Sequence, residues 1–161
     1  MIHDSLIPEI QKAAKAWALD PLLIAAIILQ ESAGNPYALR FEPGWSLYKD
    51  PEIWAKKNGT SVATEKMGQA FSYGLCQIMG TVARERGFQG PLGKLYAIDT
   101  NLLYACAQLR LLYDRHKNES DVISAYNAGT PKRTSSGYIN QSYVNSVYKF
   151  KRALADKFKP V

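Results

Sequence analysis

The sequence contains few of the residues that bind metals or cross-link a chain. It has two cysteines and two histidines in 161 residues, and Cys76 and Cys106 lie far apart without C-x-x-C spacing. With only His3 and His116 beside them, no zinc set can be assembled. We therefore expect no metal and no cofactor. Both cysteines lie in apolar contexts and are expected to be buried thiols, although a disulfide between them is left open.

Long hydrophobic runs are also missing. The longest, residues 22–29, is far too short to cross a bilayer, which predicts no integral membrane segment. The opening residues, MIHDSLIPEIQKAAK, lack a basic start followed by an apolar run and do not read as a secretory signal. A mature form whose leader had been removed would look the same, so export stays open. Repeats, low-complexity tracts and interdomain linkers are absent, which predicts a single domain over residues 1–161.

Two kinds of residue are abundant, basic residues and aromatic residues. The chain carries 20 lysines and arginines against 14 aspartates and glutamates, a formal net charge of +6. This charge favours a polyanionic partner, which can be nucleic acid, anionic lipid or anionic cell wall. Ten tyrosines and three tryptophans are the second excess. Because aromatic faces stack on sugars and on bases alike, these residues indicate a polymer-binding groove as readily as core packing.

The spacing of apolar residues predicts a mainly helical fold of about seven to eight helices. Expected helices cover residues 5–19, 21–32, 50–55, 61–71, 99–116 and 141–157, with a short one from residue 81 and another from residue 120 into AYNAG. Asp99 and Ser120 are the expected N-caps of the helices that follow them. The segments GFQGPLGK and TPKRTSSG are expected to be loops, and any sheet is small and lies near residues 71–78.

The second helix is expected to form the centre of the core. Asp20 caps it and Pro21 takes its first position, a favourable start for a helix. Residues 22–29 are apolar on nearly all sides, which predicts complete burial. The helix should end near Ser32, with Gly34 as its C-cap.

Glu31 lies in the last turn of this apolar helix. At helical spacing Ile24, Ile27 and Ile28 share its face. Apolar surroundings and the negative end of the helix dipole both disfavour the carboxylate, and we expect both to raise the pKa of Glu31. This makes Glu31 a candidate proton donor near neutral pH. The alternative is a solvated glutamate at a fraying helix end.

The stretch GLCQIMG, residues 74–80, places Gln77 between two glycines and among apolar residues. One interpretation is a short buried strand in which the Gln77 amide has a structural role. The other is that the glycines allow the backbone to approach a ligand closely and that Gln77 holds this ligand. The stretch alone does not decide between them.

Four segments occur in a fixed order: QESAGNPYA from residue 30, SYGLCQIMG from 72, AYNAG from 125 and YVNSVYKF from 143. This series resembles the soluble lytic transglycosylase family, whose lysozyme-like domain is mostly helical and cleaves peptidoglycan. The resemblance covers about residues 22–148. It implies a lysozyme-like fold, mainly α with a very small β element, and peptidoglycan glycan strands as the partner.

The resemblance also implies a reaction. Glu31 would be the single catalytic acid and base in cleavage of the MurNAc–GlcNAc β-1,4 bond. It would protonate the glycosidic oxygen and then take the proton of the C6 hydroxyl of N-acetylmuramic acid. The product would carry a 1,6-anhydro end, made without water.

Substrate-binding residues follow from the same resemblance. Gln77 would hold the acetamido or nearby sugar groups. Tyr143 would form a hydrogen bond near Glu31 or the acetamido group. Tyr126 and Asn127 would line the groove, and Ser72 would contact substrate.

The sequence departs from the family pattern in two places. Cys76 stands where the family has methionine, which changes or repacks a wall of a sugar subsite. The segment between Glu31 and Gly74 is long for the family and contains RFEPGW, with Glu42 at the expected groove edge. A second carboxylate near the first would allow water to be activated, as in a lysozyme-type muramidase. The alternative for Glu42 is a salt bridge with Arg40 or another cation.

Other classes of protein stay open. A nucleic-acid-binding helical domain would gather its basic residues on one stripe, whereas here they are spread along the chain, so we expect no nucleic acid partner. A non-catalytic wall-binding or virion structural module is a further alternative.

We expect a monomer that acts on the bacterial cell wall in the periplasm. A wall-degrading enzyme without a visible signal must be delivered, which favours a phage endolysin or virion enzyme, or a secretion apparatus.

Overall fold

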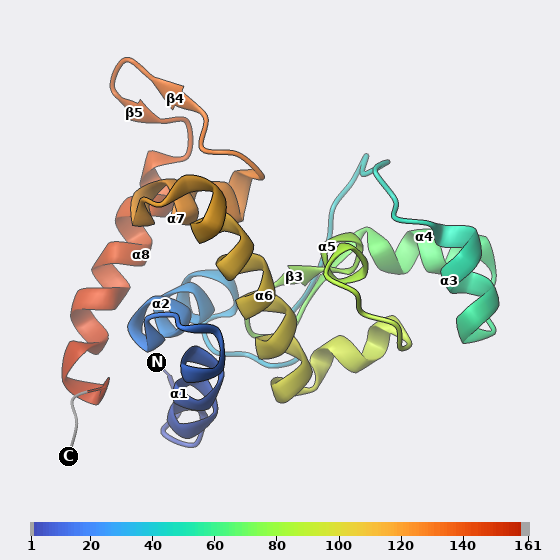
Figure 1. Ribbon diagram of the computed structural model, residues 1–161, viewed down its shortest axis with the longest axis horizontal. Helices are drawn as coiled ribbons and strands as arrows, with labels where there is room; N and C mark the ends of the chain where they lie inside the picture. Colours follow the sequence, from blue (N-terminus) through green and yellow to red (C-terminus); the bar gives the residue numbers. More distant parts are fainter. Residues whose placement is uncertain (1, 159–161) are drawn as a thin grey trace. The chain divides into compact units, whose positions relative to one another are not determined.

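The computed structural model describes residues 2–158, and within them the fold is mainly α-helical, as the sequence predicts (Figure 1). The helices are α1 (Leu6–Trp17), α2 (Pro21–Ser32), α3 (Pro51–Asn58), α4 (Val62–Gln69), α5 (Gly80–Glu85), α6 (Ile98–His116), α7 (Glu119–Ala128) and α8 (Gln141–Leu154), with 3-10 helices η1 (Leu92–Tyr96) and η2 (Ala155–Phe158). The strands are β1 (Leu39–Phe41), β2 (Phe71–Tyr73), β3 (Ile78–Met79), β4 (Arg133–Thr134) and β5 (Gly137–Tyr138).

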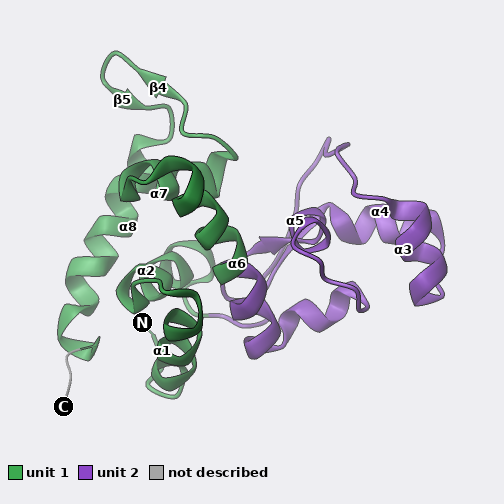
Figure 2. Cartoon of the chain, in the orientation of Figure 1, with its two compact units in different colours: residues 1–34, 106–161 green, residues 35–105 purple. Residues whose placement is uncertain are grey.

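The chain forms two compact units (Figure 2). The terminal unit contains the residues up to Gly34 and those from Cys106 onward, and the central unit contains residues 35–105. Helix α6 begins in the central unit and ends in the terminal one. Cys106 and Cys76 therefore belong to different units, and both are buried thiols.

Helix α2 forms the core of the terminal unit. Asp20 caps it by accepting a hydrogen bond from the Leu22 N–H at 2.9 Å. Every side chain from Leu23 to Ile28 is buried, and the helix packs against α8 and α1 (Figure 1). The buried central helix is thus confirmed. The expected C-cap is wrong by one residue, because Ala33 already takes the left-handed conformation at φ 54°.

A three-stranded antiparallel sheet with the order β1-β2-β3 lies in the central unit. Leu39 pairs with Tyr73 and Arg40 pairs with Ser72, and paired residues project from the same face of a sheet. Because neighbours along a strand alternate between faces, Leu39 and Tyr73 lie on one face and Arg40 and Ser72 on the other. The first face continues into an apolar cluster formed by Tyr73, Ile78, Ala83, Phe88, Leu92 and Leu95.

Gln69, the last residue of α4, joins three segments of the central unit. Its Oε1 accepts the Lys49 N–H at 2.7 Å, and its Nε2 donates to the Lys49 carbonyl and to Glu65, each at 3.0 Å. Glu65 also pairs with Arg84 of α5 at 2.8 Å, and their side chains are 4% and 0% exposed. Since each buried group has its partner, this network fixes the segment before α3 and the helix α5 to α4.

Two expected helix starts are wrong. Asn118, and not Ser120, caps α7, because its Oδ1 accepts the N–H groups of Ser120 at 2.9 Å and Asp121 at 3.2 Å. Helix α6 begins at Ile98, so Asp99 lies inside its first turn. An aspartate is favourable there too, since it faces the positive end of the helix dipole.

The two expected loops contain regular structure. GFQGPLGK includes the start of η1, and TPKRTSSG includes β4 and part of β5, which pair as an antiparallel hairpin. The sheet near residues 71–78 is present as β2 and β3, and β1 adds a third strand that the sequence does not predict. Among the described residues, no helix has the length and apolar character needed to cross a membrane.

Candidate active site

Glu31 and Tyr143 lie side by side in the terminal unit although they are 112 positions apart in the sequence. Glu31 is half-buried in the last turn of α2, and Tyr143 is buried in the first turn of α8. The Tyr143 hydroxyl donates a hydrogen bond to Glu31 Oε1 at 2.6 Å. This length lies at the short end of the range for an O–H···O hydrogen bond. The packing of α2 on α8 therefore brings a carboxyl group and a phenol into direct contact.

Glu31 lies on the same face of α2 as three buried isoleucines. Ile24, Ile27 and Ile28 are 0 to 1% exposed. Ser32 closes the helix, because its hydroxyl donates to the Ile28 carbonyl at 3.1 Å and accepts the Gly34 N–H at 3.2 Å. The carboxyl group is thus held at the end of a rigid buried helix. Chemically, such a group can give and take a proton at a fixed place.

Tyr126 and Asn127 lie in the last turn of α7, also in the terminal unit. Tyr126 is half-buried and Asn127 is exposed. Asn127 Oδ1 accepts a hydrogen bond from Asn140 at 3.0 Å, and Asn140 also bonds the Ser124 hydroxyl and carbonyl at 2.7 and 3.0 Å. Because Asn140 immediately precedes α8, these bonds tie the end of α7 to the start of the helix that carries Tyr143.

Gln77 lies in the tight turn between β2 and β3 of the central unit. Its Nε2 donates to the carbonyls of Ala38 and Gly74, both at 3.0 Å. Since both partners are acceptors, only the nitrogen of the amide can face them, which fixes its orientation. Oε1 accepts no hydrogen bond from any residue that the structure describes. The nitrogen of the amide therefore bonds the backbone of the turn, and its oxygen is available as a hydrogen-bond acceptor.

Ser72 and Glu42 lie together on the polar face of the sheet. Glu42 Oε1 accepts from Arg40 Nε at 2.7 Å and from the Ser72 hydroxyl at 3.4 Å. The Arg40–Glu42 salt bridge is the alternative that the sequence offered for Glu42. Both bonds engage Oε1 of the carboxylate, so Arg40 and Ser72 hold Glu42 at the polar face of the sheet. Cys76, the other departure from the family pattern, is buried at 1% exposure.

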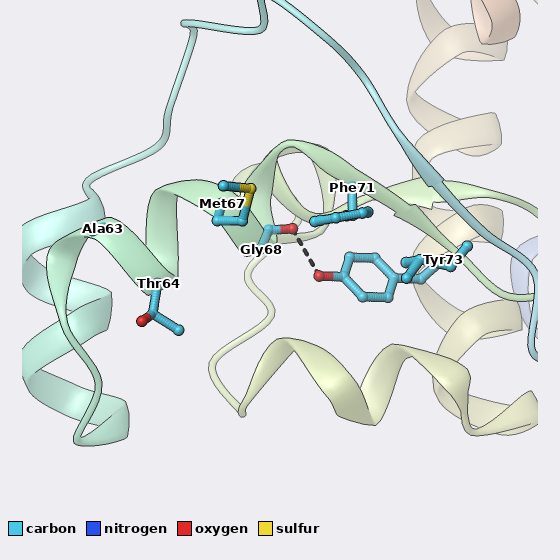
Figure 3. A pocket seen from close by; sticks show the side chains of 7 residues that line it. Ala63, Thr64, Met67, Gly68, Phe71 and Tyr73 are labelled. Atoms are coloured by element: carbon cyan, nitrogen blue, oxygen red, sulfur yellow. Dashed lines mark hydrogen bonds between the residues drawn. The ribbon is translucent and has the colours of Figure 1, made fainter.

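The opposite face of the sheet forms an apolar groove with α4 (Figure 3). Leu39, Met67, Phe71 and Tyr73 line a pocket of about 510 Å³, and the Tyr73 hydroxyl donates to the Gly68 carbonyl at 2.8 Å. Burial raises the pKa of Tyr73, so this phenol stays protonated. The two faces of the sheet thus differ in chemistry, and Ser72 and Glu42 lie on the face away from this groove.

The structure gathers the predicted residues into two groups. Glu31, Tyr143, Tyr126 and Asn127 belong to the terminal unit, and Gln77, Ser72 and Glu42 belong to the central unit. Within the described part of the chain, no cluster of three or more histidine, cysteine, aspartate or glutamate side chains could hold a metal ion.

Asn101, which the sequence pattern does not mark as functional, contacts the turn that carries Gln77. Asn101 of α6 is fully buried and bonds the backbone of the turn that carries Gln77. Its partners are main-chain atoms, which leave no side-chain pattern in a sequence.

Comparison with known proteins identifies the family of the chain. The transglycosylase SLT domain matches residues 8–145. No curated protein matches the sequence. The matched range contains Glu31, Gln77 and Tyr143 and spans most of the 161 residues. The chain belongs to the transglycosylase SLT domain family, within the lysozyme-like superfamily.

Proposed function

We propose that this protein is a lytic transglycosylase that cleaves the MurNAc–GlcNAc β-1,4 bond of peptidoglycan and leaves a 1,6-anhydro-MurNAc end. Membership of the SLT family supports cleavage of a glycosidic bond in the cell wall. The observation that carries the finer proposal is the 2.6 Å hydrogen bond between Tyr143 and Glu31 at the end of an apolar helix. It supports Glu31 as the catalytic acid, because the bond holds this carboxyl group in place.

In the first step the protonated Glu31 gives its proton to the glycosidic oxygen while the bond from this oxygen to C1 of MurNAc breaks. The GlcNAc residue leaves with a new hydroxyl group. In the second step the C6 oxygen of the same MurNAc bonds to C1, and its proton returns to Glu31. No water is consumed, and the carboxyl group ends in its starting state. With Oε1 accepting from Tyr143, the transferred proton is carried by Oε2.

The choice of C6 hydroxyl over water has a physical basis. Hydrolysis with inversion needs a base that activates water about 6.5–9.5 Å from the acid, whereas a hydroxyl group of the same sugar needs no such base. Intramolecular attack also has a large entropic advantage over attack by bulk water. The salt bridge of Glu42 with Arg40 opposes its use as this base. A lysozyme-type muramidase is the alternative function, and Glu42 would be the candidate for its base.

The other predicted residues would bind the glycan strand. Gln77 offers its Oε1 as an acceptor for an acetamido N–H or a sugar hydroxyl. Ser72 offers a hydroxyl group on the polar face of the sheet, and Tyr126 and Asn127 would line the groove in the terminal unit. We propose that the chain acts as a single monomeric domain on the bacterial cell wall. A phage endolysin or virion origin stays a prediction.

The experiment that tests the proposal is mass spectrometry of the soluble fragments from purified peptidoglycan. Anhydro-muropeptides should appear, lighter by one water than lysozyme products, and new reducing ends should not. Fragments that carry reducing muramic acid would instead identify a hydrolase. Glu42→Gln would then be the variant to assay, because Glu42 would become the leading candidate for the base.

The same assay with Glu31→Gln gives its catalytic control. The amide keeps the volume of the side chain and can still accept from Tyr143, but it cannot shuttle a proton. Release of fragments should fall by at least about a hundredfold, the lower end of general acid contributions. The matched control is Glu9→Gln, an exposed glutamate in the first turn of α1. Glu9→Gln should cleave like the unchanged protein, and an active Glu31→Gln would remove the mechanism.

A further inference from the structure

The turn that carries Gln77 has a backbone conformation that must be held by its surroundings. Gly74 has φ 67° and Gln77 has φ 46°, so both take the left-handed region. Glycine does so freely, but glutamine does so rarely and under strain. Strain of this kind persists only where neighbouring groups determine the conformation, and it gathers at functional sites.

Asn101 supplies these neighbouring groups. It lies in the first turn of α6, and its side chain is 0% exposed. Its Oδ1 accepts the Cys76 N–H at 2.8 Å, and its Nδ2 donates to the Tyr73 carbonyl at 2.7 Å and to the Leu95 carbonyl at 2.9 Å. Tyr73 directly precedes Gly74 and Cys76 directly precedes Gln77. One amide therefore bonds the backbone on both sides of the strained turn.

The fit between Asn101 and this turn is close. A Cβ atom added at Gly74 would lie 2.6 Å from Asn101 Nδ2, a distance that real Cβ atoms do not show. The Gly74 carbonyl is in turn one of the two acceptors of the Gln77 amide. Contacts thus run without a gap from Asn101 through the turn to the Gln77 side chain.

We propose that Asn101 is a positioning residue for substrate binding. By fixing the backbone from Tyr73 to Cys76, it sets the place at which Gln77 Oε1 meets the glycan. Asn101 itself is buried and touches no substrate. This inference rests on the proposed role of Gln77 in sugar binding.

A double-mutant cycle on soluble glycan fragments tests the coupling. Gln77→Ala and Asn101→Ala should each raise KM by about two- to twelvefold, the range for one lost hydrogen bond, and should change kcat little. The KM of the double variant should not exceed the higher of the two single-variant KM values, because both changes remove the same interaction. Effects that multiply, or an unchanged KM in either single variant, would overturn the inference.

Gln69→Leu is the matched control. Gln69 is also a fully buried amide of the central unit with several hydrogen bonds, but none of them reaches residues 73–77. Its loss should lower the melting temperature as the loss of Asn101 does, yet leave KM unchanged. A rise in KM for Gln69→Leu as large as that for Asn101→Ala would reduce Asn101 to a general structural residue and overturn the proposal.

Asn101→Asp covers the case in which Asn101→Ala does not fold. A protonated aspartic acid can accept from Cys76 and donate to one of the carbonyls, whereas the carboxylate faces these carbonyls with a charge. KM relative to that of the unchanged protein should therefore approach one as the pH is lowered from 8 to 5. A ratio that does not change with pH contradicts the proposal.

The result for Glu31→Gln separates this inference from the proposed function. If Glu31→Gln is inactive while the effects of Asn101 and Gln77 multiply, the function stands and the positioning role falls. If Glu31→Gln remains active, the catalytic proposal itself falls.

Discussion

Tyr143 connects the chemistry of Glu31 to the packing of the terminal unit. Its hydroxyl donates to a carboxylate, and such a bond favours the ionised form of the acid. The proposed first step, however, requires the protonated form. We therefore expect the tyrosine to affect proton transfer by Glu31 as well as to hold the group in place.

Replacement of Tyr143 by phenylalanine should shift the pH dependence of cleavage. Loss of the donor destabilises the carboxylate, which raises the pKa of Glu31 relative to its value in the unchanged protein. The alkaline limb of the activity profile should then move to higher pH by up to about one unit, since one hydrogen bond of this kind is worth about 1.5 kcal/mol. The measurement is the rate of fragment release between pH 4 and 9.

Tyr148→Phe is the control for this shift. Tyr148 lies on the same helix and its hydroxyl also forms a hydrogen bond, to Ser120 at 2.9 Å. Loss of the Tyr148 hydroxyl should not shift the alkaline limb of the activity profile. If Tyr143→Phe gives the same profile as Tyr148→Phe, Glu31 does not govern the alkaline limb.

Glu31 can be predicted from the sequence, whereas its setting cannot. Its place at the end of an apolar helix follows from the neighbouring residues in the sequence. The contact with Tyr143 needs the packing of α2 on α8, which joins residues 112 positions apart. Asn101 escapes prediction for another reason, because main-chain partners leave no pattern in the side chains.

At the scale of elements, periodicity predicts the long helices well and the short strands poorly. Helix α2 is marked by a cap, a proline and a continuous apolar run. Strand β1 has three exposed residues, and β4 and β5 have two residues each. These strands are too short or too exposed to show an alternation of apolar and polar residues. The sequence does not distinguish the two candidate caps of α7, because Asn118 and Ser120 are both good N-cap residues two positions apart.

Lys151 ties three helices of the terminal unit together. Its Nζ lies 2.8 Å from Asp20, the cap of α2, and 2.9 and 3.0 Å from the carboxylate oxygens of Glu119 at the start of α7. Burial lowers the pKa of Lys151, but the bonds and charges of the two carboxylates outweigh it, so the net shift is upward. A raised lysine pKa means that this stabilisation is complete below the ordinary lysine value and disappears only as pH rises through the folded value.

Lys151→Met should therefore destabilise the protein at neutral pH. The variant leaves Asp20 and Glu119 half-buried without their cation, and the free energy of unfolding should fall by about 2 kcal/mol. Urea unfolding at pH 7 measures this. Lys149→Met, an exposed lysine on the same helix, should change it by less than about 0.5 kcal/mol. Equal effects of the two substitutions would show that the three-helix tie contributes nothing.

At the scale of the whole molecule, composition predicts the partner more coarsely than the motifs do. A net charge of +6 fits nucleic acid, anionic lipid and anionic wall alike. The mainly α fold and the buried central helix follow from periodicity, and both are confirmed. The division into two compact units is not predicted, since no change of composition marks positions 34 or 105.

The charge excess gives a prediction that discriminates among these partners. Binding of the inactive Glu31→Gln variant to purified peptidoglycan that carries its acidic peptides should weaken as NaCl rises. The Debye length is about 10 Å at 0.1 M and falls to about 3 Å at 1 M, so surface lysines and arginines lose their attraction for the polymer. Chitin has the same linkage without the carboxylates, and its binding should change little with salt. Sedimentation of the protein with each insoluble polymer gives the bound fraction. Binding to peptidoglycan that does not depend on salt would mean that the sugar contacts alone provide recognition. Tighter binding to duplex DNA than to peptidoglycan would favour the nucleic-acid alternative over the function proposed above.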